Sequence, residues 1–384
     1  MDFESLFDIP IDDLHTPCYL TDARLLQKNT ALLKQIQQRT GCKILLAQKA
    51  FSMFSAYPLI RDDLAGTTAS GLFEAKLGRE HFGKEVHVFS PAYTQEDFTQ
   101  LLELCDHIVF NSFGQWKKYR QQVQDATRNI SCGIRVNPGY AEVETDLYNP
   151  CISGSRMGVP LEQMEEEGFD GLDGIHFHTM CEQNSDVLER TLDQMLPKFD
   201  KWLKRCKWVN FGGGHHITRP DYDIERLVRC IERVRDAYYG VQVYLEPGEA
   251  VALNAGYLVA TVLDIVHNGM NIAILDASAA CHMPDVLEMP YRPHILYSGK
   301  PEEKVHTYRL AGNTCLAGDV IGDYSFDHRL QPGDKLVFCD MAIYSMVKNN
   351  TFNGVPLPDI ALYQNGKIEL VKHFGYADFE GRLS

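Results

Sequence analysis

The chain has 384 residues, of which 45% are hydrophobic and 23% are charged, and its formal net charge is -15. This composition is typical of a globular chain with a large core and two domains, and it argues against disorder. The negative charge argues against a nucleic-acid partner, because phosphate backbones need a surface rich in lysine and arginine, and it is more compatible with a cationic ligand.

No uninterrupted apolar segment reaches membrane-spanning length, and the acidic first 14 residues lack the basic start of a secretory signal. The 11 cysteines are scattered singly without CxxC pairs, so neither a zinc cage nor a disulfide framework is indicated. We therefore expect a cytoplasmic protein with reduced thiols, no membrane partner and no metal.

The first predicted elements are a strand in TPCYLTD, residues 16–22, and an amphipathic helix over residues 22–40. Short β-rich runs then alternate with plausible helices, which is the repetition of a parallel sheet. About eight such units suit a TIM-like (β/α)8 barrel, an α/β fold, better than an open sheet. The runs lie in residues 43–47, 65–78, 85–90, 107–111, 131–137, 174–178, 208–214 and 241–248.

After residue 250 the β-rich runs follow one another with turns such as QPGDK and few long helices, which predicts a mainly antiparallel β domain. The strand at 16–22 is expected to join that sheet. The predicted domains are therefore a barrel over residues 22–252 and a β domain made of residues 1–21 plus 253–384.

Lys49 follows the apolar run of residues 44–47, and a strand end is an unusual place for its charge. Burial lowers the pKa of a lysine by penalising the ammonium form, and a neutral amine can form a Schiff base with a carbonyl. The alternative is a lysine whose amine extends into solvent. In a (β/α)8 barrel the chemistry lies at the C-terminal ends of the strands. The residues at the other strand ends therefore help to decide between a Schiff-base lysine and a solvent-exposed one.

Two strand ends fit a phosphorylated pyridine cofactor. Gly212, Gly213 and Gly214 lack Cβ atoms, so their N–H groups can approach an anion such as phosphate; a tight turn is the alternative. Glu246 ends the next run and could hold a pyridinium N–H, which keeps a pyridine ring electron-withdrawing. A surface glutamate before a turn is its alternative.

His176 and His178 flank Phe177, so the two-residue strand period places both histidines on one side of a predicted strand. An imidazole there could stack on an aromatic cofactor. A metal site would need a third ligand, and none is evident. For His176 we expect a packed core histidine with satisfied hydrogen bonds.

The ordered set of a strand-end lysine, a histidine, a glycine triplet and a glutamate resembles the fold-type III pyridoxal-phosphate decarboxylases. This family includes the diaminopimelate, ornithine and carboxynorspermidine decarboxylases. The resemblance covers residues 16–354, nearly the whole chain. Its further motifs are RVNP at 135–138, SRMGV at 155–159 and GNTC at 312–315.

The resemblance implies pyridoxal 5'-phosphate as the cofactor. Lys49 is similar to the Schiff-base lysine, and His178 to the residue that stacks on the ring. The glycines at 212–214 are similar to the phosphate loop, and Glu246 to the partner of the pyridine nitrogen.

Two residues of the β domain are also implied. Cys315 resembles the cysteine that a second subunit inserts into the site, and Tyr344 the tyrosine near the phosphate. Family members pair head to tail, so a homodimer with shared active sites is implied.

Departures from the family pattern indicate the substrate. Glu249 stands in place of the arginine of an EPGR motif, and a glutamate favours a cationic amine. The acidic residue usually near the inserted cysteine is Leu316, with Asp319 three positions further on. CHMPDVLEMPYRP at 281–293 is most similar to carboxynorspermidine decarboxylases. We therefore expect Glu249, Asp285 and Asp319 to bind the amino groups of a polyamine-like substrate.

The expected reaction is decarboxylation of carboxynorspermidine or carboxyspermidine to norspermidine or spermidine, in polyamine biosynthesis. The resemblance implies that it proceeds through a Schiff base on Lys49 and a quinonoid carbanion, and that Cys315 of the second subunit, or Lys49, returns a proton. The alternatives are a diaminopimelate decarboxylase, a fold-type III amino-acid racemase and a non-catalytic pyridoxal-phosphate-binding protein.

Overall fold

The computed structural model describes residues 4, 7–165 and 167–384. The chain forms two compact units, one from Gln27–Val251 and the other from the residues up to Leu26 together with Ala252–Ser384. The division falls within two helices, α2 (Ala23–Thr40) and α9 (Gly248–Ala252). The domain limits expected at residues 22 and 252 therefore stay a prediction, and residues 1–3 and 5–6 of the expected β domain lie outside the described residues.

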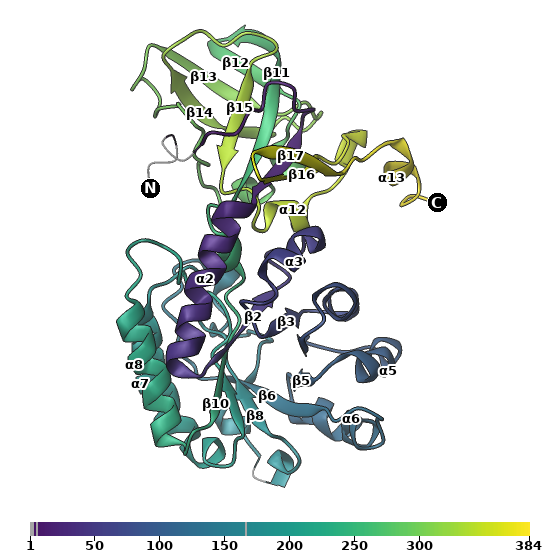
Figure 1. Cartoon of the computed structure of the whole chain (residues 1–384), viewed down its shortest axis with the longest axis vertical. Coiled ribbons are helices and arrows are strands. Elements are labelled where there is room, and N and C mark those ends of the chain that lie inside the picture. Colours follow the sequence, from purple (N-terminus) through teal and green to yellow (C-terminus); the bar gives the residue numbers. More distant parts are fainter. Residues whose placement is uncertain (1–3, 5–6, 166) are drawn as a thin grey trace. The chain divides into compact units, whose positions relative to one another are not determined.

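The first unit is a closed barrel of eight parallel strands (Figure 1). The strands pair in the order β2-β3-β4-β5-β6-β8-β9-β10, and β10 pairs with β2 to close the ring. The short β7 (Val159–Pro160) pairs only with β6. This confirms the (β/α)8 barrel predicted from the sequence. The barrel strands are β2 (Lys43–Ala47), β3 (Gly66–Ala69), β4 (Glu85–Phe89), β5 (His107–Phe110), β6 (Ser131–Asn137), β8 (Gly174–His176), β9 (Trp208–Asn210) and β10 (Gln242–Leu245).

Helices surround these strands, and α7 packs against α8 (Figure 1). Thr94, Ser112 and Asp223 each accept a hydrogen bond from a backbone N–H of the following helix, which satisfies a donor that the first turn leaves open. The helices of this unit after α2 are α3 (Tyr57–Ile60), α4 (Leu72–Leu77), α5 (Gln95–Leu104), α6 (Phe113–Gln124), α7 (Ser185–Leu203) and α8 (Ile224–Ala237).

Trp208 explains two glycines in the barrel strands. A Cβ atom at Gly174 would lie 2.1 Å from the Trp208 ring, and one at Gly133 would lie 2.2 Å from it. The indole therefore fills space that side chains at these positions would occupy. Tight interior packing of this kind makes the barrel a solid core, so that ligands are bound at its ends.

The second unit is a mixed sheet of eight strands. β1 (Cys18–Asp22) lies between β11, to which it is antiparallel, and β16, to which it is parallel. The strand expected at 16–22 therefore does join this sheet. β12 and β13 are also parallel, and the other pairs are antiparallel. The remaining strands are β11 (Gly256–Asn268), β12 (Met270–Leu275), β13 (His306–Ala311), β14 (Val320–Phe326), β15 (Lys335–Cys339), β16 (Asp359–Gln364) and β17 (Lys367–Lys372).

This unit also has short helices, of which the last follows the final strand β17. They are α10 (Ala279–His282), α11 (Asp285–Glu288), α12 (Ser345–Lys348) and α13 (Tyr376–Glu380). Among the helices that the structure describes, none combines the length and the apolar character needed to cross a bilayer.

Candidate active site

Residues after four barrel strands share one cavity at the C-terminal edge of the barrel. Lys49 follows β2, His178 follows β8, Gly213 follows β9 and Glu246 follows β10. The parallel strands bring these ends together, as the sequence predicted. Ala47, Lys49, Thr68, Ala69, Ser70, Phe89, Arg135, His176, His178, Gly213 and Glu246 line the cavity.

Lys49 extends into this cavity and its side chain keeps contact with solvent there. Desolvation of its amine by the surrounding protein and the positive charge of Arg135 lower the pKa of Lys49, although nearby glutamates oppose the shift. A lowered pKa increases the fraction of neutral amine, which is the nucleophilic form.

Glu246 is a nearly buried carboxylate, with 13% of its side chain exposed. Its Oε1 accepts a hydrogen bond from Asn210 Nδ2 at 2.8 Å, and its Oε2 lies 3.4 Å from His176 Nε2. Burial alone would raise the pKa of Glu246, but His176, His87 and Asn210 outweigh burial and hold the pKa at about 2. Glu246 is therefore negatively charged at neutral pH.

His178 is held by the glycine turn. The backbone N–H of Gly213 donates to His178 Nδ1 at 2.8 Å, so this nitrogen carries no proton. Burial and the positive charges of Lys49 and Arg135 lower the pKa of His178 well below its usual value. The ring is therefore a neutral imidazole with its proton on Nε2.

His176 differs from the expectation of a core histidine with satisfied hydrogen bonds. It is 2% exposed, but among the described residues neither ring nitrogen has a partner with hydrogen-bond geometry. Burial lowers the pKa of His176, so its contact with Glu246 involves a neutral ring at neutral pH. Both histidines line the cavity as predicted, although β8 ends at His176 and His178 lies in the following loop.

The glycine turn has little room for side chains. Gly212 and Gly214 have φ angles of +70° and +82°, and a Cβ at Gly213 would lie 2.6 Å from the Glu246 carbonyl oxygen. Gly212 N–H donates to Asn210 Oδ1 at 2.8 Å, and Gly213 N–H is engaged by His178. Of the three amides, only that of Gly214 lacks a protein acceptor among the described residues.

Glu249 lies in the first turn of α9 and is paired with His216. Its Oε2 lies 3.0 Å from His216 Nε2, and about a tenth of each side chain is exposed. Burial alone would lower the pKa of His216, but the hydrogen bond to Glu249 and the charge of Glu249 raise it. Glu182 reaches the same cluster, within 4.8 Å of the other ligand-type atoms. We call Glu182, His216 and Glu249 the acidic cluster.

The remaining expected site residues belong to the second unit. Cys315 is exposed in the loop between β13 and β14, and its N–H donates to Asn353 Oδ1 at 2.7 Å. Asp319 is 3% exposed and holds that loop: its carboxylate accepts from Ser278 Oγ at 2.8 Å, Thr314 Oγ1 at 2.7 Å and a backbone N–H.

Asp285 and Tyr344 lie at the starts of two short helices of this unit. Lys348 Nζ contacts Asp285 Oδ1 and also lies 2.6 Å from Glu288 Oε2. Tyr344 has φ +54° and ψ -48°, and Ser345 N–H bonds the Ile343 carbonyl at 2.5 Å. This is a γ-turn of the rare, strained type, which costs about 1–3 kcal/mol. Strain of this size is frequent at functional sites.

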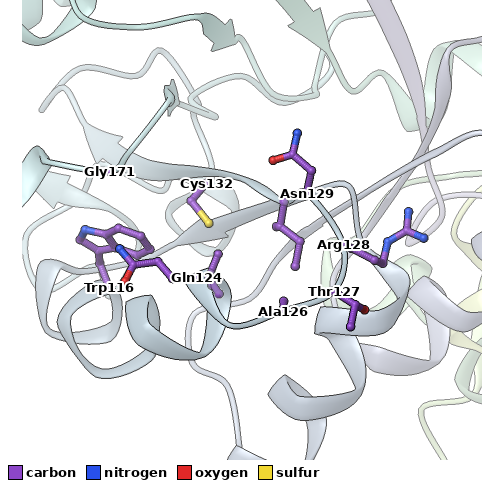
Figure 2. Close-up of a pocket in the computed structure, with 10 residues that line it drawn as sticks. Trp116, Gln124, Ala126, Thr127, Arg128, Asn129, Cys132 and Gly171 are labelled. Carbon is purple, nitrogen blue, oxygen red and sulfur yellow. The ribbon is translucent and has the colours of Figure 1, made fainter.

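A second cavity, of about 410 Å³, lies beside the C-terminal end of α6 and the start of β6 (Figure 2). Two of its polar groups already have partners. Arg128 pairs with Asp106 at 2.6 Å, and Trp116 Nε1 donates to the Asp170 carbonyl at 3.2 Å. None of the site residues predicted from the sequence is among the described residues that line this cavity.

Sequence reasoning gave no role to three residues of the first unit. Asn210 links the glycine turn to Glu246, and His216 pairs with Glu249. Arg135 lies with its guanidinium 4.6 Å from the centre of the Phe89 ring, and burial lowers its pKa to about 10. Only Arg135 carried a signal, as part of the RVNP motif.

The sequence model of one protein family, described as "Pyridoxal-dependent decarboxylase, C-terminal sheet domain", matches residues 18–342. A carboxynorspermidine/carboxyspermidine decarboxylase from Campylobacter jejuni is 42% identical to this chain, over 97% of this chain and 99% of its own length. A carboxyaminopropylagmatine decarboxylase from Synechocystis is also 42% identical, over 97% of this chain and 96% of its own length.

The fold is similar to a crystal structure of carboxynorspermidine decarboxylase from Campylobacter jejuni complexed with norspermidine. The TM-score is 0.89 and the sequences are 41% identical, over 96% of this chain and 100% of that one. Several diaminopimelate decarboxylases are more distant, between 21% and 29% identical.

Proposed function

The chain belongs to the pyridoxal-dependent decarboxylases, and we propose that it decarboxylates carboxynorspermidine or carboxyspermidine, yielding norspermidine or spermidine. The observation that carries this substrate is the 42% identity, over nearly the full length, to the Campylobacter jejuni enzyme of that name. In a diaminopimelate decarboxylase the second carboxylate of the substrate would meet Glu249, which would repel it.

The cavity fits pyridoxal 5'-phosphate as the cofactor. An amine with a lowered pKa, a neutral imidazole and a buried carboxylate that is ionised at neutral pH all line it. Buried ring nitrogens of His176 have no hydrogen-bond partner among the described residues, which is unusual in a complete core and typical of a site that receives a ligand.

We assign four residues to the cofactor. Lys49 would hold it through its amine, and His178 would stack on its ring. Glu246 would accept a hydrogen bond from the protonated ring nitrogen. An amino-acid racemase of this fold usually has an arginine there instead. The free amide of Gly214 would donate to the phosphate, while Gly212 and Gly213 keep the turn in place.

When bound, pyridoxal 5'-phosphate supplies a ring that takes up the electron pair left by departing CO₂. Glu246 would favour the protonated form of this ring, because a carboxylate that is ionised at neutral pH stabilises a nearby positive charge. Asn210 orients this carboxylate through its hydrogen bond and favours the ionised form. A proton must then reach the former α-carbon, from Cys315 of a second copy of the chain or from Lys49.

The acidic cluster would recognise the cationic tail of the substrate. The cluster brings two carboxylates and one imidazole together, and carboxylates attract a cationic ammonium group. In the described chain, one carboxylate oxygen of Glu249 is hydrogen-bonded to His216. The other oxygen can accept a hydrogen bond from an amine of the substrate. Glu182, His216 and Glu249 follow β8, β9 and β10, at the same edge as the Lys49 cavity.

In the second unit, the geometry of Asp319 favours a structural role, because its carboxylate is buried and fully engaged with the Cys315 loop. Asp285 keeps a partly exposed carboxylate and is the better candidate for an amine. Tyr344 is assigned to the cofactor phosphate. The chain is proposed to form a homodimer in which each copy supplies Cys315 to the other.

A second candidate substrate is carboxyaminopropylagmatine. The Synechocystis carboxyaminopropylagmatine decarboxylase has the same 42% sequence identity to this chain as the Campylobacter jejuni enzyme. The guanidinium end of this substrate would also suit a pair of carboxylates, which bind a planar guanidinium through two hydrogen bonds.

The test is CO₂ release by the purified, cofactor-loaded protein with carboxynorspermidine, carboxyspermidine, carboxyaminopropylagmatine and meso-diaminopimelate in parallel. A Lys49→Ala protein serves as the blank. The proposal expects the highest kcat/KM with one of the first two compounds. A preference for carboxyaminopropylagmatine would support the second candidate, and turnover of diaminopimelate alone would overturn both.

A further inference from the structure

Two histidines and an aspartate from distant parts of the sequence meet in the second unit. His15 precedes β1, Asp359 begins β16 and His373 follows β17. His15 Nδ1 lies 2.9 Å from Asp359 Oδ2, and His373 Nδ1 lies 2.9 Å from Asp359 Oδ1. The two imidazole rings are 5.6 Å apart, with their planes at 71°.

The three side chains differ in exposure. Asp359 is 3% exposed and also accepts a hydrogen bond from the Phe374 N–H at 3.3 Å, so its position is fixed. The side chains of His15 and His373 are 70% and 59% exposed. The group therefore has one rigid carboxylate and two adjustable imidazoles that solvent ions can reach.

These distances are close to those of a metal site. Bonds of about 2.0–2.2 Å to zinc in a tetrahedron separate neighbouring ligand atoms by roughly 3.3 Å. Each imidazole nitrogen is 2.9 Å from an oxygen of Asp359, and the three ligand atoms lie within 4.8 Å of one another, so an adjustment of the two exposed rings would admit an ion. Water would complete the coordination, as it does in open zinc sites with three protein ligands.

Two other groups of potential ligands in the described chain are poorer candidates. The first group is Glu85, His87 and His107. Its Glu85 is already paired with Lys43. Its two imidazole rings stack 3.9 Å apart with planes 7° from parallel, so their nitrogens do not point at a common centre. The acidic cluster belongs to the candidate active site.

Among the described residues, only the two histidines form ion pairs with Asp359. No lysine or arginine there would compete with a metal ion for this carboxylate. Lys372, next to His373 in the chain, lies 3.6 Å from Asp378 instead.

We propose that His15, Asp359 and His373 bind a divalent transition-metal ion of the type that imidazole ligands favour, such as Zn²⁺. The ion would fasten the segment before β1 to the end of β17, which are far apart in the sequence. Any ion that binds the folded form alone stabilises it, so this site would raise the unfolding temperature of the protein.

The test is titration of the cofactor-loaded protein with Zn²⁺ by calorimetry, together with its thermal unfolding with and without Zn²⁺. The variants are His15→Gln and His373→Gln, whose side chains are exposed enough for the fold to tolerate the change. His267→Gln is the matched control, because His267 is an exposed histidine of the same unit outside the cluster.

The proposal expects one Zn²⁺ per chain, an affinity that falls roughly tenfold or more in each of the two variants, and no change in the control. The rise in unfolding temperature with Zn²⁺ should disappear in both variants. Visible absorbance of tetrahedral Co²⁺ should appear only in the wild type and the control. Absence of saturable binding by the wild type, or equal binding by His15→Gln, would overturn the proposal.

Discussion

Asn210 donates its amide N–H to Glu246 Oε1 over 2.8 Å, while its amide oxygen accepts from the Gly212 N–H over the same distance. Because the oxygen is committed to an N–H donor, the NH₂ group must face Glu246. One side chain thus aligns the glycine turn with the carboxylate and favours the ionised form of Glu246.

Glu246→Gln should lower kcat by roughly a hundredfold or more, because a neutral amide cannot stabilise a protonated ring nitrogen as a full negative charge does. The amide keeps the size of the carboxylate and can still accept from Asn210, so the fold should persist. Steady-state kinetics and circular dichroism check both expectations. A variant with wild-type kcat would remove Glu246 from the reaction.

Stability should also depend on Glu246 at acid pH. Its pKa falls from an ordinary 4.5 to about 2 in the folded protein, so its contribution is present above pH 4.5 and is lost as the pH falls toward 2. Urea unfolding at several pH values should therefore show a difference between wild type and Glu246→Gln that shrinks below pH 4.5.

Lys49→Ala should reduce CO₂ release to background and abolish the yellow colour of lysine-bound cofactor, because the chain then lacks the amine at the end of β2. Lys207→Ala is the control, since Lys207 is a surface lysine with 77% of its side chain exposed. Absorbance spectra of both purified variants decide the matter, and a retained band in Lys49→Ala would contradict the assignment.

Glu249→Gln should lower kcat/KM for carboxylated polyamines tenfold or more, because a hydrogen bond to a charged group contributes about 1.5–3 kcal/mol. Glu249→Arg should be worse, since it places a positive charge near a cationic tail. Glu225→Gln is a matched control on the same unit, with a glutamate that is 64% exposed. Equal kinetics for Glu249→Gln and the control would exclude Glu249 from substrate binding.

His216→Gln should change the pH dependence of stability. The folded pKa of His216 is raised above its ordinary 6.5, so its contribution is fully present below pH 6.5 and is lost as the pH rises through the folded value. The stability advantage of wild type over His216→Gln should therefore decrease above pH 6.5. An advantage that grows with pH would show that His216 is not stabilised as an imidazolium.

Asp319→Asn should destabilise the protein by about 1–3 kcal/mol and leave KM nearly unchanged, because the amide cannot satisfy all three donors that the carboxylate accepts. Asp323→Asn is the comparison, since that carboxylate forms a half-exposed pair with Arg309. An increased KM at unchanged stability would instead favour the substrate contact that the sequence suggested for Asp319.

Mixing the Lys49→Ala and Cys315→Ala proteins under conditions that exchange subunits should restore about a quarter of wild-type activity. Half of the dimers are then mixed, and each mixed dimer has one intact shared site. CO₂ release before and after exchange is the measurement. No recovery after demonstrated exchange would place both residues in a site made by one chain.

Sequence reasoning predicted the barrel well, because most of its parallel strands are buried apolar runs between amphipathic helices. It was less accurate at the strand ends: the runs at 174–178 and 208–214 are strands only to His176 and Asn210. In the second unit it missed β14, β16 and β17. Most side chains of β17 are exposed, so its sequence contains no apolar run that would predict a strand.

The resemblance to fold-type III decarboxylases is confirmed by the family match and the relatives at 42% identity. What the sequence did not reveal are pairings set by tertiary structure. Glu249 and His216 are 33 positions apart, and Asn210 looked like an ordinary strand residue. Such side chains acquire their roles only when neighbouring strands bring them together.

The place of β1 in its sheet constrains the order of events during synthesis. Residues 18–22 leave the ribosome early, but their neighbours β11 and β16 begin only at Gly256 and Asp359. The barrel strands all emerge in between, and domains generally fold as units as the chain is made. A nascent chain therefore carries β1 with both edges unpaired until β11 has been made, and with one edge unpaired until β16 follows.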